Sequence, residues 1–124
     1  MTPPAWQRLE SIAIAVAVIV ATVVLDYDWW WLLVLFLAFD LSAIGYAAGP
    51  RIGALAYNAV HSYWAPAALA VIALTADARW AGLVALAWAF HVSADRALGY
   101  GLKHSDDFQH THLGWIGKGR HAPE

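Results

Sequence analysis

The chain has 124 residues, of which 61% are hydrophobic and 13% are charged, and its formal net charge is −2 at pH 7. Soluble domains are closer to half apolar and a quarter charged, so this composition favours an integral membrane protein. The negative balance and the lack of a basic block argue against nucleic acid as a partner. The absence of cysteine excludes disulfides, zinc–thiolate sites and thiol nucleophiles.

Four long apolar runs predict transmembrane helices at about 9–25, 29–48, 53–75 and 79–100, each near the ~20 residues that cross a bilayer. Polar or glycine- and proline-containing links separate them, at 26–28, 49–51 and 76–79. Such continuous runs exclude a membrane β-barrel, whose strands alternate. The links are short, which predicts antiparallel neighbours. We therefore expect one domain over 1–124: an all-α, integral membrane four-helix bundle with a polar tail at 102–124.

The distribution of basic residues predicts the orientation of this bundle. With four spans, one side carries Arg8, Arg51, Arg96, Lys103, Lys118 and Arg120, whereas the other carries only Arg79. The positive-inside rule then places both termini in the cytoplasm. Glu10 precedes the first run and Asp26-Tyr27-Asp28 follows it, which favours a retained span over a cleaved signal peptide.

Three ionisable side chains on three different predicted spans fall at the same depth. Helical rise places Asp40, His61 and His91 about 12–13 Å from the cytoplasmic ends of their spans. Asn58 and Asp95 lie one turn nearer the cytoplasm, and His91 and Asp95 share one helix face because they are four residues apart. Pro66 is expected to kink the third span one turn beyond His61. The sequence thus predicts a polar layer in the cytoplasmic half.

This layer has two interpretations. The side chains can form a hydrogen-bonded network that fixes helix packing. Alternatively, two imidazoles and one or two carboxylates are ligand types for a divalent metal such as zinc or iron. A metal held by Asp40, His61 and His91 would leave a position open for water, with Asp95 as a ligand or base. No local spacing such as H-E-x-x-H supports the metal.

The polar tail is rich in histidine, and a solvated tail is its simplest interpretation. It nevertheless leaves the fourth span on the side of the polar layer, so His112 has the opportunity to cap the cavity. Asn58 and Arg96 are expected to assist the site. Alanines in the first span permit close contact with another helix, within the chain or in a homo-oligomer.

Several segments resemble the small bacterial membrane proteins grouped as domain of unknown function 4260. The matching stretches are Phe39-Asp40-Leu41-Ser42, Gly49-Pro50-Arg51-Ile52-Gly53-Ala54, Tyr57-Asn58 with His61, His91 with Asp95 through Lys103, and Thr111-His112-Leu113-Gly114. The resemblance implies a four-helix membrane protein, which we expect in a bacterial inner membrane, but brings no activity. Because it continues into the tail, it implies that His112 belongs with the inner site.

Three hypotheses follow. The leading hypothesis is a membrane-embedded metalloprotein or metalloenzyme that acts on a lipid-like or small hydrophobic substrate. Its metal ligands would be Asp40, His61, His91 and His112, with Asp95, Asn58 and Arg96 in catalytic roles. The second is a small oligomeric proton-coupled transporter, in which the same groups titrate. The third is a structural membrane module with a hydrogen-bonded His–Asp network.

Overall fold

The computed structural model describes residues 1–41, 47–102 and 110–116. Its elements are α1 (Pro3–Val24), α2 (Trp31–Phe39), α3 (Pro50–Val60), α4 (Trp64–Thr75), α5 (Arg79–Leu98), β1 (His110–Thr111) and β2 (Gly114–Trp115). The two short strands pair antiparallel, with Thr111 opposite Gly114. The predicted all-α class is confirmed, since the helices build the described fold and each strand has two residues.

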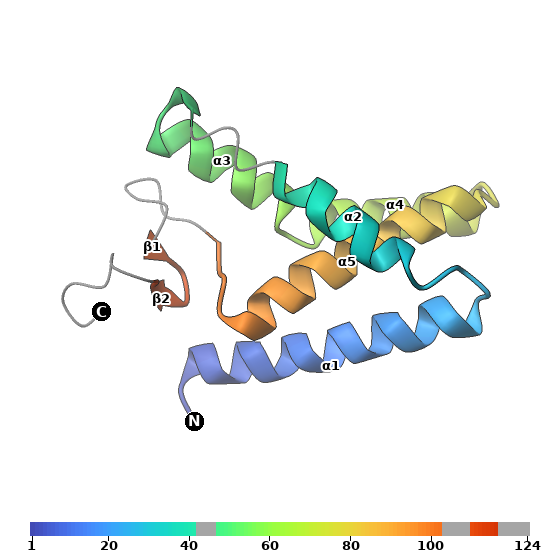
Figure 1. The fold of residues 1–124 in the computed structure, drawn as a ribbon, viewed down its shortest axis with the longest axis horizontal. Coiled ribbons are helices and arrows are strands. Elements are labelled where there is room, and N and C mark those ends of the chain that lie inside the picture. Colours follow the sequence, from blue (N-terminus) through green and yellow to red (C-terminus); the bar gives the residue numbers. More distant parts are fainter. Residues whose placement is uncertain (42–46, 103–109, 117–124) are drawn as a thin grey trace.

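Helix α5 lies at the centre of the fold, with α1, α2 and α4 packed around it (Figure 1). α1 runs antiparallel to α5. At one end Arg8 Nε donates to the Ala97 carbonyl at 3.0 Å. At the other end Arg79 donates to the carbonyls of Leu25 and Asp26 at 2.8 and 2.9 Å. These two arginines therefore fix the register of the long helices.

α1 begins at Pro3, before the predicted start near residue 9, and its end at Val24 agrees with the prediction. The hydroxyl of Thr2 accepts from the Ala5 N–H at 3.3 Å, and prolines occupy the first two helical positions, where their missing N–H groups cost no helical bond. The buried residues are Ser11, Val18 and Thr22, spaced seven and four apart on one stripe. Because Ser11 and Thr22 donate to their own helix's carbonyls, this polar stripe is satisfied internally.

The third predicted span is interrupted at His61 itself, in place of the kink that Pro66 was expected to cause one turn beyond it. α3 ends at Val60 and α4 begins at Trp64, so the break falls at residues 61–63. Pro66 becomes the third residue of α4, where its absent N–H leaves no helical bond unmade. His61 consequently sits at the end of α3, with φ −95° and ψ 28°, instead of inside a continuous helix.

The second predicted span is also shorter than expected. α2 ends at Phe39, residues 40 and 41 follow in 3₁₀ conformation, and residues 42–46 lie outside the described residues. α5 agrees closely with the fourth predicted span and ends at Leu98. Gly99 follows it, with a positive φ of 98° that suits glycine. A continuous four-helix bundle is therefore not confirmed.

The tail differs from the polar extension predicted from the sequence, because 110–116 contain the β1–β2 hairpin. His112 lies in the turn of this hairpin and contacts residues near both ends of the helical region. The Leu102 N–H donates to its Nδ1 at 2.7 Å, and its Nε2 lies 2.8 Å from Gln7 Oε1 on α1. Residues 103–109 and 117–124 lie outside the described residues, and with them Lys103, Lys118 and Arg120, which were used to predict the orientation.

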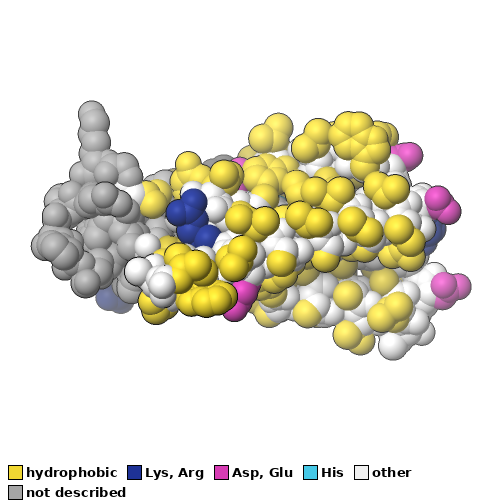
Figure 2. Space-filling view, turned by 90° about the horizontal axis from the view of Figure 1, so that it is seen from below, with side chains coloured by type: hydrophobic (Ala, Val, Ile, Leu, Met, Phe, Trp, Pro, Cys, Tyr) yellow, Lys and Arg dark blue, Asp and Glu magenta, His cyan; other side chains and the backbone are white. Residues whose placement is uncertain are grey.

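Large apolar side chains cover much of the surface, as Figure 2 shows on one face. Of the described helices, α1 alone is long and apolar enough to cross a membrane, and only 17% of its most apolar window is buried inside the fold. α2, α3 and α4 are too short by themselves. One apolar N-terminal helix is weak evidence for a membrane location. The inner membrane and the cytoplasmic side of both termini stay predictions.

Candidate metal centre

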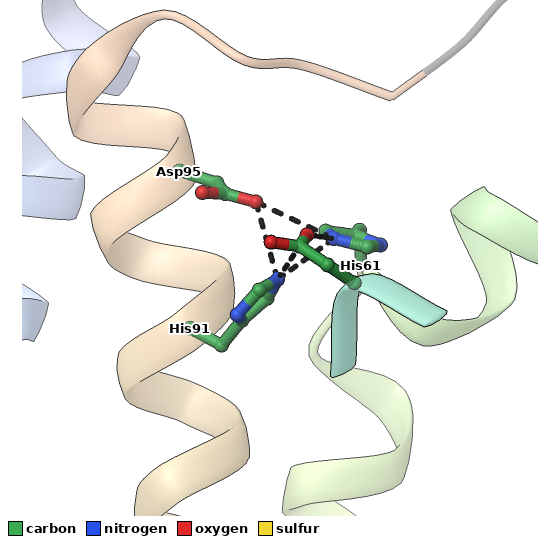
Figure 3. A group of neighbouring side chains, drawn as sticks. His61, His91 and Asp95 are labelled. Atoms are coloured by element: carbon green, nitrogen blue, oxygen red, sulfur yellow. Dashed lines mark hydrogen bonds and ion pairs between the residues drawn. The ribbon is translucent and has the colours of Figure 1, made fainter. Parts of the chain in front are cut away.

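Four side chains from three parts of the chain converge beside the break between α3 and α4. His61 comes from the end of α3, Asp40 from the end of α2, and His91 and Asp95 from α5. One ligand atom of each lies within 4.8 Å of the others. Figure 3 shows the two imidazoles and Asp95 pointing toward one another. The sequence-derived grouping of these residues is thus reproduced in three dimensions.

The contacts inside this cluster are short and reciprocal. His61 Nε2 lies 3.3 Å from Asp40 Oδ1 and 3.3 Å from Asp95 Oδ2. His91 Nε2 lies 3.2 Å from each of the same two oxygens. The two Nε2 atoms are 2.8 Å apart. Each imidazole therefore faces both carboxylates and the other imidazole through a single nitrogen.

The orientation of His61 is set by Tyr57, one turn earlier on α3. His61 Nδ1 lies 2.9 Å from the Tyr57 carbonyl oxygen, which can only accept, so Nδ1 carries a hydrogen. The two rings also stack, with centroids 3.7 Å apart and planes 4° from parallel. In the neutral ring Nε2 is then a bare lone pair directed into the cluster. A histidine held this way, by a carbonyl behind it, is the usual arrangement of a metal ligand.

The end of α3 is held by side-chain donors that replace the missing helical N–H groups. The carbonyl of Asn58 accepts from the Ser62 hydroxyl at 2.6 Å. Two indoles serve the next carbonyls: Trp64 donates to Ala59 at 2.8 Å and Trp88 to Val60 at 2.6 Å. Arg96 then donates to the carbonyl of His61 itself at 3.0 Å. These bonds satisfy the carbonyls freed by the break and fix the backbone that carries His61.

His91 is fully buried on α5, against aromatic rings of α2. The ring centroid of Phe36 lies 4.2 Å from that of His91, and the centroid of Phe39 lies 5.7 Å away. Its Nδ1 has no hydrogen-bond partner among the described residues. The polar interactions of this ring are therefore made through Nε2, on the side of the cluster.

If both imidazoles are neutral and both carboxylates are ionised, hydrogen bonds alone do not account for the five short contacts. The hydrogen on His61 then sits at Nδ1, so only His91 can bring a hydrogen into the cluster. A cation at the centre would face all four lone pairs. A tetrahedral zinc ion bound at about 2.0–2.1 Å separates its ligand atoms by about 3.3–3.4 Å. The four nitrogen–oxygen distances of 3.2–3.3 Å match that spacing, whereas the Nε2–Nε2 distance of 2.8 Å is shorter.

Three residues predicted for the site lie outside this four-residue group. Arg96 acts on the backbone of His61, as described above, and Asn58 lies one turn before His61 on α3. His112 is placed elsewhere, because both of its ring nitrogens are engaged with Leu102 and Gln7. The prediction of His112 beside the cluster is therefore corrected: tail folding brings it to the start of α1 instead.

Sequence reasoning missed the residues that orient the two histidines. The spacing of Tyr57 and His61, four apart, was available as a signal for stacking on one helix face. The contacts of Trp88 and Arg96 with the end of α3 were not, because they depend on a helix break that no local pattern marked. The same holds for the packing of Phe36 on His91.

A comparison with family models places residues 4–116 in a family described as domain of unknown function (DUF4260). No curated protein and no solved structure matches the chain. The resemblance inferred from the motifs is thereby confirmed, and it covers nearly all of the described fold.

Proposed function

The chain belongs to the DUF4260 family, whose description names no activity, so we propose a function from the site. We propose that the protein is a membrane-embedded metalloprotein that binds one divalent ion through Asp40, His61, His91 and Asp95. Zinc is the first candidate for this ion. The observation that carries this proposal is the set of four nitrogen–oxygen distances of 3.2–3.3 Å around two imidazoles and two carboxylates. Two imidazoles and two carboxylates also balance the charge of a divalent cation. Iron is the second candidate, because it accepts the same ligand types.

The membrane part of the proposal rests on the exposed apolar surface. α1 keeps most of its apolar residues outside the fold, including Ile12, Val16, Ile19 and Val23, and α4 exposes Ile72 and Leu74. Contiguous apolar surface of this extent is typical of a membrane or protein interface. We propose that the helices lie in the bilayer as one domain, with both termini on the cytoplasmic side.

We further propose that the protein is an enzyme and that its substrate is lipid-like or a small hydrophobic molecule. A groove of about 340 Å³ runs along α4 and α5, lined only by apolar residues. Its lining includes Leu25 at the end of α1, Pro66 on α4 and Ala89 on α5. The groove supports a hydrophobic substrate class, and the metal would supply the polarising charge.

Elemental analysis of detergent-purified protein tests the metal directly. About one zinc or iron per chain is expected in the wild type and in His112→Ala, and none in His61→Ala or His91→Ala. His112→Ala is the matched control, because it removes an imidazole that lies away from the cluster. Metal-free, well-folded wild type would refute the proposal and favour a network in which a protonated imidazole donates to a carboxylate.

A further inference from the structure

The four proposed ligands are not held equally firmly. His61 and His91 are 2% and 0% exposed, and each is fixed by a stacked or packed aromatic ring. The Asp95 side chain is 11% exposed and lies on α5, four residues from His91. The Asp40 side chain, in contrast, is 50% exposed. One ligand of the set therefore faces the surroundings while three are enclosed.

The position of Asp40 along the chain also differs from that of Asp95. Asp40 follows the last residue of α2, which has nine residues, and has 3₁₀ conformation. Asp95 sits inside a 20-residue helix at the centre of the fold. Both carboxylates make polar contacts with the same two imidazoles, so the two ligands differ in exposure and in the element that carries them. Asp40 can leave the cluster with the end of a short helix, whereas Asp95 is held by the central helix.

From this asymmetry we infer that Asp40 is the exchangeable ligand, and that the site admits an external anionic donor in its place. The inference rests on the proposed metal site. His61, His91 and Asp95 form the permanent set, in place of the sequence-derived set of Asp40, His61 and His91 with Asp95 as a ligand or base. Catalytic zinc sites commonly keep three protein ligands and one exchangeable position.

The charge of the opened site specifies the class of ligand. When the Asp40 oxygen leaves, two neutral imidazoles and one carboxylate face a divalent cation, so one positive charge is uncompensated. An incoming donor that is itself an anion restores the balance. The groups that fit are a carboxylate or a phosphate-type oxygen, which is compatible with the polar end of a lipid-like molecule. Arrival of the anion and departure of Asp40 are a ligand exchange without oxidation or reduction.

Cobalt(II) and azide provide the test, because tetrahedral cobalt(II) has visible absorption that responds to its ligands. Metal-free protein in detergent is titrated with cobalt(II) and then with azide, for wild type, Asp40→Ala, Asp40→Asn and Asp95→Ala. Asp40→Ala and Asp40→Asn should each bind one cobalt(II) and respond to azide at a concentration roughly tenfold lower than wild type. Asp95→Ala should bind cobalt(II) at least about tenfold more weakly than Asp40→Ala, because it removes an enclosed ligand held by the central helix.

Different results refute the metal site and the exchangeable role of Asp40. A wild-type protein that is folded by circular dichroism and binds no cobalt(II) refutes the metal site itself. Stoichiometric binding in the wild type, together with equal weakening by Asp40→Ala and Asp95→Ala, refutes only the exchangeable role of Asp40. An Asp40→Asn spectrum that azide leaves unchanged would refute it as well, since this variant keeps the shape of the side chain.

Discussion

Arg96, on the central helix α5, donates a hydrogen bond of 3.0 Å to the backbone carbonyl of His61, 35 residues away in the sequence. The bond joins α5, which carries His91 and Asp95, to the segment between α3 and α4, which carries His61. Arg96 is therefore a positioning residue: it contacts none of the four ligand atoms, but it fixes the backbone from which one of them projects.

Arg96→Met should lower zinc affinity by about 10–100-fold while leaving a folded protein, since the loss of a residue that orients a ligand has effects of this size. Competition with a chromophoric chelator measures the affinity. Arg96→Lys keeps a charged donor and should recover part of the loss. Equal affinity in wild type and Arg96→Met would show that the packing of Tyr57 alone positions His61.

Trp88→Phe should destabilise the fold by about 1–3 kcal/mol, because it leaves the Val60 carbonyl without its indole donor while keeping an aromatic ring against Phe39. Denaturant titration in detergent micelles measures the change. Trp80→Phe is the matched control: Trp80 is 66% exposed at the start of α5, and its replacement should change stability by less than about 0.5 kcal/mol. Similar effects of the two substitutions would contradict the role given to Trp88.

Val16→Asp separates a membrane-embedded α1 from one that is exposed to water. Val16 is 54% exposed near the middle of α1, so a carboxylate there costs about 2.5–3.5 kcal/mol in a bilayer and little in water. Extraction from cell membranes with alkaline carbonate measures membrane integration, which should fall in Val16→Asp. The control is Leu25→Asp, at the end of α1, where the charge reaches the interface. Full retention of Val16→Asp in the membrane would argue against this placement.

Metal affinity should fall as the pH is lowered, because protons compete with the cation for the imidazole nitrogens of His61 and His91. Cobalt(II) titrations at several pH values follow this loss, and Asp40→Ala should show the same direction of change. Affinity that is independent of pH would indicate that the cation is held without the imidazoles.

Gly101→Ala should release the β1–β2 hairpin from the body of the fold. A Cβ at this position would come within 2.6 Å of His112 Nδ1 and 3.0 Å of the Leu113 side chain, so the turn has to shift. Limited proteolysis should then cleave the tail faster. Zinc binding should remain unchanged, because His112 lies outside the cluster. Loss of zinc binding in Gly101→Ala would contradict this and indicate that the tail contributes to the metal site.

The amino-acid sequence by itself determined the helical class, α5 almost to its ends, and the four residues of the cluster. Apolar runs and polar links specify where helices form, and the fixed rise of a helix converts sequence position into depth. The common level of Asp40, His61 and His91 followed from that rise. Depth, however, says nothing about the direction in which a side chain points or about what covers it.

Only the tertiary structure decided how the site is built. The break at 61–63 depends on donors from α5, Trp88 and Arg96, that are 28 and 35 residues from the carbonyls they serve. The contrast between exposed Asp40 and enclosed Asp95 arises because α2 ends beside the cluster whereas α5 passes through the centre of the fold. His112 lies against Gln7 because the tail turns toward α1. Each outcome is a contact between distant segments, which local periodicity and propensity do not encode.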